Sequence, residues 1–126
     1  MSSRPVISIV DDDDDVRVSL DSLLRSYGFT IQLFDSAEEF MASGQAVDTD
    51  CLISDIQMPG MSGLGMFERL VSQGIHIPVI FITASVDQAT KLAAQRLGAT
   101  GYLMKPFDGA PLLAFIKTAL SSKSPD

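Results

Sequence analysis

Short apolar runs alternate five times with amphipathic segments along this chain, and this alternation constrains its fold more than any other feature. The runs are Val6–Val10, Phe29–Phe34, Cys51–Ser54, Pro78–Ile82 and Gly101–Met104. Four of them are nearly continuous in apolar residues, which is typical of strands covered on both faces. Because parallel strands need right-handed crossover connections, five strand–helix repeats predict an α/β fold, with a doubly wound five-stranded parallel sheet between two layers of helices.

The run Phe29–Phe34 has a different pattern. Its residues fall into two alternating sets, Phe29, Ile31 and Leu33 against Thr30, Gln32 and Phe34. Alternation of this kind is typical of a strand with one face partly in water. The run is therefore predicted to lie at an edge of the sheet.

Helical periodicity in the intervening segments predicts five helices. The patterned segments are Val16–Tyr27, Ala37–Ala42, Leu64–Val71, Gln88–Leu97 and Leu112–Leu120. Ser36 and Asp87 occupy positions suited to N-caps, and Glu39 completes a capping box with Ser36.

One domain accounts for nearly all of the 126 residues, a length that can bury a single core. We expect residues 1–120 to form this domain. Residues 121–126 have the small, polar, proline-containing sequence SSKSPD, so they are expected to be a linker or a frayed end. If they are a linker, an output domain lies outside this chain.

Composition argues against two kinds of partner. The net charge is −7, and the nine Lys and Arg residues are spread from Arg4 to Lys123 without a basic cluster, so direct contact with nucleic acid is not expected. No apolar stretch approaches membrane-spanning length, and the N-terminus lacks the apolar core of a secretory signal. The single cysteine, Cys51, cannot form an internal disulfide. We expect a cytoplasmic protein without membrane contact.

Polar residues follow four of the predicted strands. Asp11 and Asp12 follow the first run, Asp55 the third, Thr83 the fourth and Lys105 the fifth. Ligands of an open parallel sheet bind beyond the carboxyl ends of its strands. These residues are therefore expected to meet at one rim of the sheet.

The chemistry of this set points to a phosphate site. The three carboxylates would repel one another, and a divalent cation such as Mg²⁺, which prefers oxygen ligands, would remove that cost. Asp55 could then act as a nucleophile and form an acyl phosphate. Lys105 could offer a positive charge and Thr83 a hydroxyl group to the phosphate oxygens.

Simpler interpretations exist for single members of the set. The acidic run continues through Asp13–Asp15, which is typical of a solvated face or of a helix N-terminus. An aspartate after a strand, as at Asp55, is commonly a cap. The only histidine, His76, is expected at the surface of a loop. The case for a phosphate site therefore depends on the residues occurring together.

The motifs around these residues resemble the receiver domains of bacterial two-component response regulators. They are VDD at Val10–Asp12, SDIQMPGMSG at Ser54–Gly63, FITAS at Phe81–Ser85 and GYLMKPF at Gly101–Phe107. The likeness runs from about Pro5 to Leu120. The sequences MPGMSG and KPF are most similar to those of receivers that precede a helix-turn-helix DNA-binding domain.

The resemblance implies a flavodoxin-like (βα)5 fold with strand order 2-1-3-4-5 and a role for each residue of the site. Asp55 would be the phosphoacceptor. Asp12 would ligate Mg²⁺ directly, with Mn²⁺ as an alternative, and Asp11 would do so through water. The backbone carbonyl of Gln57 would complete the protein ligands. The phosphodonor would be a phosphohistidine of a sensor histidine kinase.

The resemblance also implies a switch. Thr83 would move toward the phosphoryl group, and Tyr102 would turn inward with it. Lys105 would bind the phosphate, and its bond to Pro106 would be cis. The surface around the helix capped by Asp87, the following strand and the last helix would control an output, expected to be transcription, and could carry a homodimer. From the residues alone, packing in place explains Tyr102 equally well.

Two other functions fit parts of the pattern. An aspartate-nucleophile phosphatase also uses Asp, Mg²⁺, Thr and Lys, but it needs a second Asp as general acid two residues after the nucleophile, where this chain has Gln57. The second alternative is an interaction module that has the same fold but works without phosphorylation. The expected function is that of a signalling switch and not of an enzyme. It would catalyse its own phosphorylation and dephosphorylation at Asp55.

Overall fold

Residues 4–84 and 87–122 are described by the computed structural model, and they form one five-stranded parallel sheet. Its strands are β1 (Val6–Val10), β2 (Thr30–Phe34), β3 (Cys51–Asp55), β4 (Val79–Thr83) and β5 (Gly101–Met104). They lie in the order β2-β1-β3-β4-β5. The doubly wound fold and the strand order are confirmed, and the predicted strand bounds agree to within one residue.

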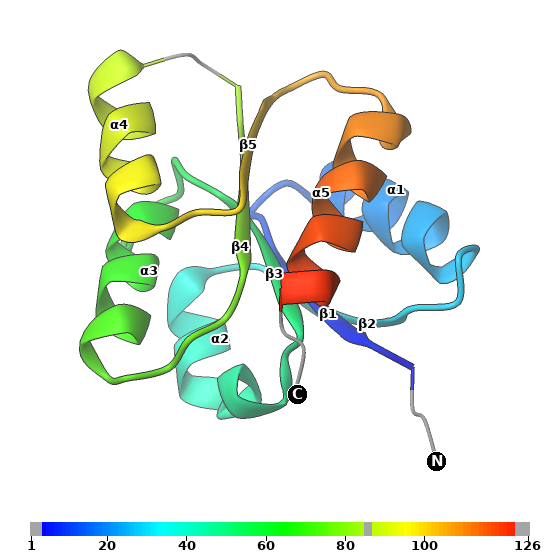
Figure 1. The fold of residues 1–126 in the computed structure, drawn as a ribbon, viewed down its shortest axis with the longest axis horizontal. Helices are drawn as coiled ribbons and strands as arrows, with labels where there is room; N and C mark the ends of the chain where they lie inside the picture. Colours follow the sequence, from blue (N-terminus) through cyan, green and yellow to red (C-terminus); the bar gives the residue numbers. More distant parts are fainter. Residues whose placement is uncertain (1–3, 85–86, 123–126) are drawn as a thin grey trace.

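Five α-helices and one short 3₁₀ helix connect these strands within the described ranges. They are α1 (Asp14–Arg25), α2 (Ala37–Ser43), η1 (Gln45–Asp48), α3 (Gly63–Ser72), α4 (Gln88–Leu97) and α5 (Gly109–Ser122). Figure 1 shows α1 and α5 on one face of the sheet and α2, α3 and α4 on the other. α5 ends two residues inside the predicted tail, whose residues 123–126 lie outside the described part of the chain.

Two hydrophobic cores fill the space between the sheet and its helices. Leu52 of β3 packs with Phe40 of α2 and Met66 of α3, whereas its neighbour Ile53 packs with Leu20 of α1 and Ile116 of α5. Successive strand residues point to opposite faces, so a strand covered on both sides needs an unbroken apolar run. Every residue of β3 and β4 is buried, as their sequences predict.

The two edge strands differ from the sequence expectation in detail. β2 lies at an edge as predicted, but Leu33 is 39% exposed, while Ile31 and Phe34 are buried in opposite cores. β5 is the other edge strand, as the order 2-1-3-4-5 implies. Tyr102 and Leu103 pack against opposite cores but are only partly buried, and Met104 is exposed, so the predicted cover on both faces is incomplete. An apolar run alone does not distinguish a central strand from an edge strand whose outer side is only partly covered.

Side-chain caps begin the helices as the sequence predicts. Ser36 accepts a hydrogen bond from the Glu39 amide at 3.0 Å. Glu39 accepts from the amide of Asp35 rather than of Ser36, so the reciprocal bond of the capping box is shifted by one residue. Asp13 is the N-cap of α1 and accepts from two amides of its first turn. The acidic run beyond Asp12 is therefore explained as a helix N-terminus.

The apolar stripe of α1 is shorter than predicted. Leu20 and Leu24 are buried, but the helix ends at Arg25 and Tyr27 is 57% exposed. His76 is exposed and Cys51 is buried, as expected. In residues 4–84 and 87–122, no helix is both long enough and apolar enough to cross a membrane.

Gly63 brings the start of α3 against the end of β3. Its amide donates to the carbonyl of Ile56 at 2.9 Å. A Cβ at Gly63 would lie 2.1 Å from the backbone oxygen of Asp55 and 2.8 Å from Oγ of Ser54. No side chain fits into that space, so a residue without Cβ is required at this point.

A Gly63→Ala variant is expected to lose about 2–3 kcal/mol of unfolding free energy, because its methyl group must displace the backbone of Asp55. Urea unfolding followed by circular dichroism measures this loss. Gly65→Ala is the matched control in the same helix, since its Cβ would lie 3.3 Å from the Ser62 hydroxyl and would meet no backbone atom outside its own helix within 4 Å. We expect its stability to change by less than about 1 kcal/mol. Equal stability of the two variants would contradict the steric explanation.

Candidate functional site

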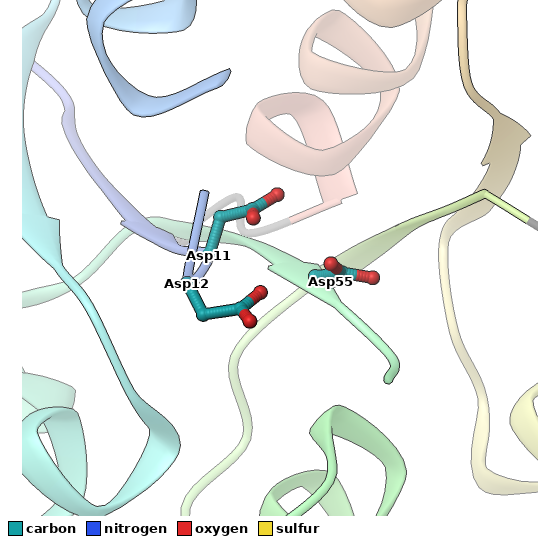
Figure 2. A group of neighbouring side chains, drawn as sticks. All are labelled: Asp11, Asp12 and Asp55. Atoms are coloured by element: carbon teal, nitrogen blue, oxygen red, sulfur yellow. The ribbon is translucent and has the colours of Figure 1, made fainter. Parts of the chain in front are cut away.

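Three carboxylates meet at the carboxyl ends of β1 and β3. Asp11 and Asp12 directly follow β1, and Asp55 is the last residue of β3, its neighbour in the sheet. One oxygen from each carboxylate lies within 4.8 Å of the others. Figure 2 shows the three side chains extending to the same side. Asp11 and Asp55 are buried, whereas Asp12 is exposed.

Lys105 brings a cation to this cluster from the loop after β5. Its Nζ donates to Oδ2 of Asp11 at 3.0 Å and to Oδ2 of Asp55 at 3.1 Å. Partial burial acts to lower the pKa of Lys105, but the hydrogen bonds and charges of the two aspartates together raise it above its ordinary value. The ammonium therefore stays protonated at neutral pH.

One ammonium does not fully balance the three acids. Burial raises the pKa of Asp11, and the charge of Asp55 raises it further, although bonds from the Asp13 amide and from Lys105 oppose this. Even with Lys105 in place, the ionised form of Asp11 is thus less favourable than that of an aspartate in water. A site built only of oxygen donors, with negative charge left over, fits a hard divalent cation such as Mg²⁺ or Mn²⁺.

The loop after β3 turns back over the end of its own strand. The Gln57 amide donates to Oδ1 of Asp55 at 3.3 Å. Gly60 has a φ of +78°, which the turn needs and which residues with a side chain rarely adopt. The Met61 amide donates to Oε2 of Glu38 at 2.8 Å, so the N-terminal turn of α2 is tied to this loop.

Thr83 and Lys105 are neighbours through the backbone. Thr83 is the buried last residue of β4, and its carbonyl accepts from the Lys105 amide at 2.7 Å. The Lys105–Pro106 peptide bond, which the resemblance implies to be cis, is cis. The sheet thus carries Asp11, Asp55, Thr83 and Lys105 to one rim, as the sequence predicts.

Tyr102 lies earlier in the chain, in the edge strand β5, three residues before Lys105. It pairs with Phe81 of β4, and its side chain is half-buried. The Nζ of Lys91, from α4, lies over the ring at 5.8 Å from its centroid. Burial raises the pKa of the Tyr102 hydroxyl, and the charge of Asp87 adds to the effect.

Two residues near the site were missed by sequence reasoning. Arg17 donates to the backbone oxygen of Asp11 and pairs with Asp14. Arg17 follows Asp14 by three residues on one helix, a spacing that predicts an ion pair between them. Glu38 reaches Met61 across 23 positions of sequence, and no local pattern indicates such a bond. Ser85, which belongs to the FITAS motif, lies outside the described residues.

Known proteins resemble this chain over most of its length. It is 39% identical over 114 residues to the transcriptional regulatory protein FixJ of Azorhizobium caulinodans, covering 90% of this chain and 54% of that protein. It is 40% identical over 121 residues to the response regulator protein TodT of Pseudomonas putida, covering 95% of this chain and 53% of that protein. The chain thus spans about half the length of these curated relatives.

Solved structures of response regulators have the same fold as this chain. The fold matches the response regulator StyR with a TM-score of 0.89 and 39% identity, covering 95% of this chain and 61% of that one. It matches the crystal structure of FixJ-N with a TM-score of 0.87 and 33% identity, over all of both chains.

A family model described as the response regulator receiver domain matches residues 7–117. These residues contain the whole sheet except Val6, the first residue of β1, and every polar residue gathered at its rim. The chain belongs to the response regulator receiver domain family.

Proposed function

We propose that this chain is a phosphorylation-dependent switch in which Asp55 accepts a phosphoryl group from a phosphohistidine of a sensor histidine kinase. The observation that carries the proposal is the position of the Lys105 ammonium, 3.0 Å from Asp11 and 3.1 Å from Asp55. Asp12 joins the same cluster from the solvent side. Mg²⁺ held by Asp11, Asp12, Asp55 and the Gln57 carbonyl would complete the site.

The reaction is a transfer of the phosphoryl group between two nucleophiles. An oxygen of the Asp55 carboxylate forms a bond to phosphorus while the bond from phosphorus to the histidine nitrogen breaks, leaving an acyl phosphate and a free imidazole. Lys105 neutralises charge on the phosphoryl oxygens, and Thr83 donates a hydrogen bond to them. Asp11, Asp12 and Asp55 would hold a divalent cation there, whose charge would lower the repulsion between carboxylate and phosphoryl oxygens. Water later attacks the acyl phosphate at phosphorus and restores Asp55.

The switch couples this chemistry to the surface formed by α4, β5 and α5. Thr83 moves toward the phosphoryl group, and Tyr102 turns inward into the space left behind. A hydrogen bond to a charged group contributes about 1.5–3 kcal/mol. Two such bonds supply most of the roughly 5.5 kcal/mol that inverts a 1:99 population. The Lys91 ammonium over the Tyr102 ring favours the present position of that ring.

A groove beside the rim suits the kinase as a partner. Its volume is about 510 Å³, and it lies between α1 and the loop that follows β5. Leu20, Leu23 and Phe107 give it an apolar lining, and Lys105 lies at its border. A helix of the kinase seated in this groove would present its phosphohistidine next to Asp55.

The output we propose is control of transcription in the cytoplasm. The relatives that support it, FixJ and TodT, are named as regulatory proteins and are about twice the length of this chain. Residues 1–120 act as the receiver domain, and residues 121–126 lead toward an output domain. Phosphorylation favours a homodimer through α4, β5 and α5, and the receiver itself does not touch DNA. Gln57, which has no acidic proton, disfavours the phosphatase alternative.

Incubation with Mg²⁺ and acetyl phosphate is expected to add one phosphoryl group to the wild-type chain and none to Asp55→Ala. Intact-mass spectrometry measures the adduct. Asp35→Asn is the matched control, because Asp35 directly follows β2 but lies outside the carboxylate cluster. It should be labelled like the wild type. Equal labelling of Asp55→Ala would place the phosphoacceptor elsewhere.

Replacing Lys105 by Met should have two opposite effects. Without the ammonium, the buried carboxylates lose their partner, so the unfolding free energy without Mg²⁺ should fall by about 1–3 kcal/mol. Mg²⁺ no longer competes with the ammonium, so its dissociation constant should fall about tenfold, equivalent to roughly 1.4 kcal/mol. Urea unfolding and isothermal titration calorimetry measure the two quantities. Weaker Mg²⁺ binding by Lys105→Met would contradict this charge balance.

Thr83→Val is expected to separate phosphorylation from the switch. With Mg²⁺ and beryllofluoride, an acyl-phosphate mimic, the wild type should show shifted NMR signals at Asp55, Tyr102 and α4. In Thr83→Val the signals around Asp55 should still shift, whereas those of Tyr102 and α4 should stay as in the free protein. Thr30→Val, on the exposed side of β2, serves as the control. Full shifts in Thr83→Val would exclude Thr83 as the link.

A further inference from the structure

Glu38 links a helix outside the rim to the loop that follows Asp55. It lies in the first turn of α2. Its Oε2 accepts a hydrogen bond from the Met61 amide at 2.8 Å, a contact across 23 positions of sequence. The bond from the Met61 amide is the largest of the effects that lower the pKa of Glu38, so the acceptor is an ionised carboxylate at neutral pH. The link is thus a charge-assisted bond between two separate elements.

The loop is shaped around this carboxylate. A Cβ at Gly60 would lie 2.3 Å from Oε2 of Glu38 and 3.2 Å from its carboxyl carbon. Gly60 also has a φ of +78°, which allows the next amide, that of Met61, to face the carboxylate. Glycine is therefore needed at position 60 both for the turn and for the approach of Glu38.

The same loop carries Gln57, whose carbonyl is the metal ligand in the proposed function. Two hydrogen bonds hold the loop: the Gln57 amide donates to the carboxylate of Asp55, and the Gly63 amide donates to the carbonyl of Ile56. Together with the bond from the Ile56 amide to the Ile82 carbonyl of β4, at 3.3 Å, they join the loop to itself and to the sheet. Glu38 adds a fixed point from α2, on the opposite side of the turn.

We propose that Glu38 is a positioning residue for the metal site, because its bond to Met61 anchors the loop that carries the Gln57 carbonyl. The inference rests on the proposed function. Mg²⁺ demands near-ideal octahedral geometry with short bonds, so a small displacement of one ligand weakens binding. Residues that orient metal ligands typically change metal affinity by about 10–100-fold.

Glu38→Ala is expected to weaken Mg²⁺ binding roughly tenfold, measured by isothermal titration calorimetry. Glu38→Gln should stay within about twofold of the wild type, because its amide oxygen still accepts the bond from Met61. Glu39→Ala is the matched control. It removes the other acid from the first turn of α2, but its bond is to Asp35 and not to the loop.

A role in helix stability alone predicts a different result. An acid in the first turn stabilises a helix through its dipole, so Glu38→Ala and Glu39→Ala would lower unfolding stability without changing Mg²⁺ affinity. The Mg²⁺-induced NMR shift of the residue after Gln57 gives a second readout. It should shrink in Glu38→Ala and persist in Glu39→Ala.

Gly60→Ala tests the contact from the side of the loop and serves if Glu38→Ala folds poorly. Its methyl group should expel the carboxylate and also strain the turn, so Mg²⁺ binding should weaken at least as much as in Glu38→Ala. In the double variant the combined loss should be smaller than the product of the two single losses, because both variants remove the same contact.

Three outcomes would count against the proposal in separable ways. Wild-type Mg²⁺ affinity in Glu38→Ala would overturn it and leave the phosphorylation switch standing. Equal weakening by Glu39→Ala would assign the effect to the helix and not to the bond. A wild-type chain that binds no Mg²⁺ would overturn the metal site itself, and this inference with it.

Discussion

The ammonium of Lys105 lies between two buried carboxylates, and the arrangement of the rest of the site depends on this contact. Asp11 directly follows β1 and Asp55 ends β3, two neighbouring interior strands of the sheet, and both carboxylates are buried. Without a nearby cation their burial would be costly. Lys105 supplies that cation from the loop after β5, although it lies 94 positions from Asp11 in the sequence. The strand order is therefore as much a part of the site as its residues, since it places β5 on the side from which the lysine reaches both acids.

Much of this could be predicted from the sequence, because the signals are local. Unbroken apolar runs marked β3 and β4, and the parallel sheet then placed Asp11, Asp55, Thr83 and Lys105 on one rim. What escaped prediction depends on three-dimensional packing. The exposure of Leu33 and Met104 follows from what covers each edge strand, and an apolar run carries no information on that. The bond from Met61 to Glu38 joins the first turn of α2 to the loop before α3, two segments brought together by tertiary packing, including that of α2 against α3.

The structure separates the proposed chemistry from its proposed readout. The carboxylates lie at the ends of β1 and β3, interior strands of the sheet, and Lys105 reaches them from the loop after β5. Tyr102 lies on an edge strand, half-buried and facing α4 through the contact with Lys91. Side chains in the first region have little freedom to rearrange because interiors are closely packed. Those in the second have solvent on one side, so a change of position there costs less. This division suits a switch whose active centre stays fixed while its surface changes.

The unequal exposure of the three acids has a consequence for the supply of magnesium. Asp12 faces solvent, while Asp11 and Asp55 are buried. An ion approaching from that side meets Asp12 first with its water shell largely intact, and no helix or strand has to move aside. In the proposed function, loading then follows the free concentration of the ion and the slow release of its bound water. Readiness of the protein for its kinase would therefore be set by ionic conditions in its surroundings, and not by an opening motion of the fold.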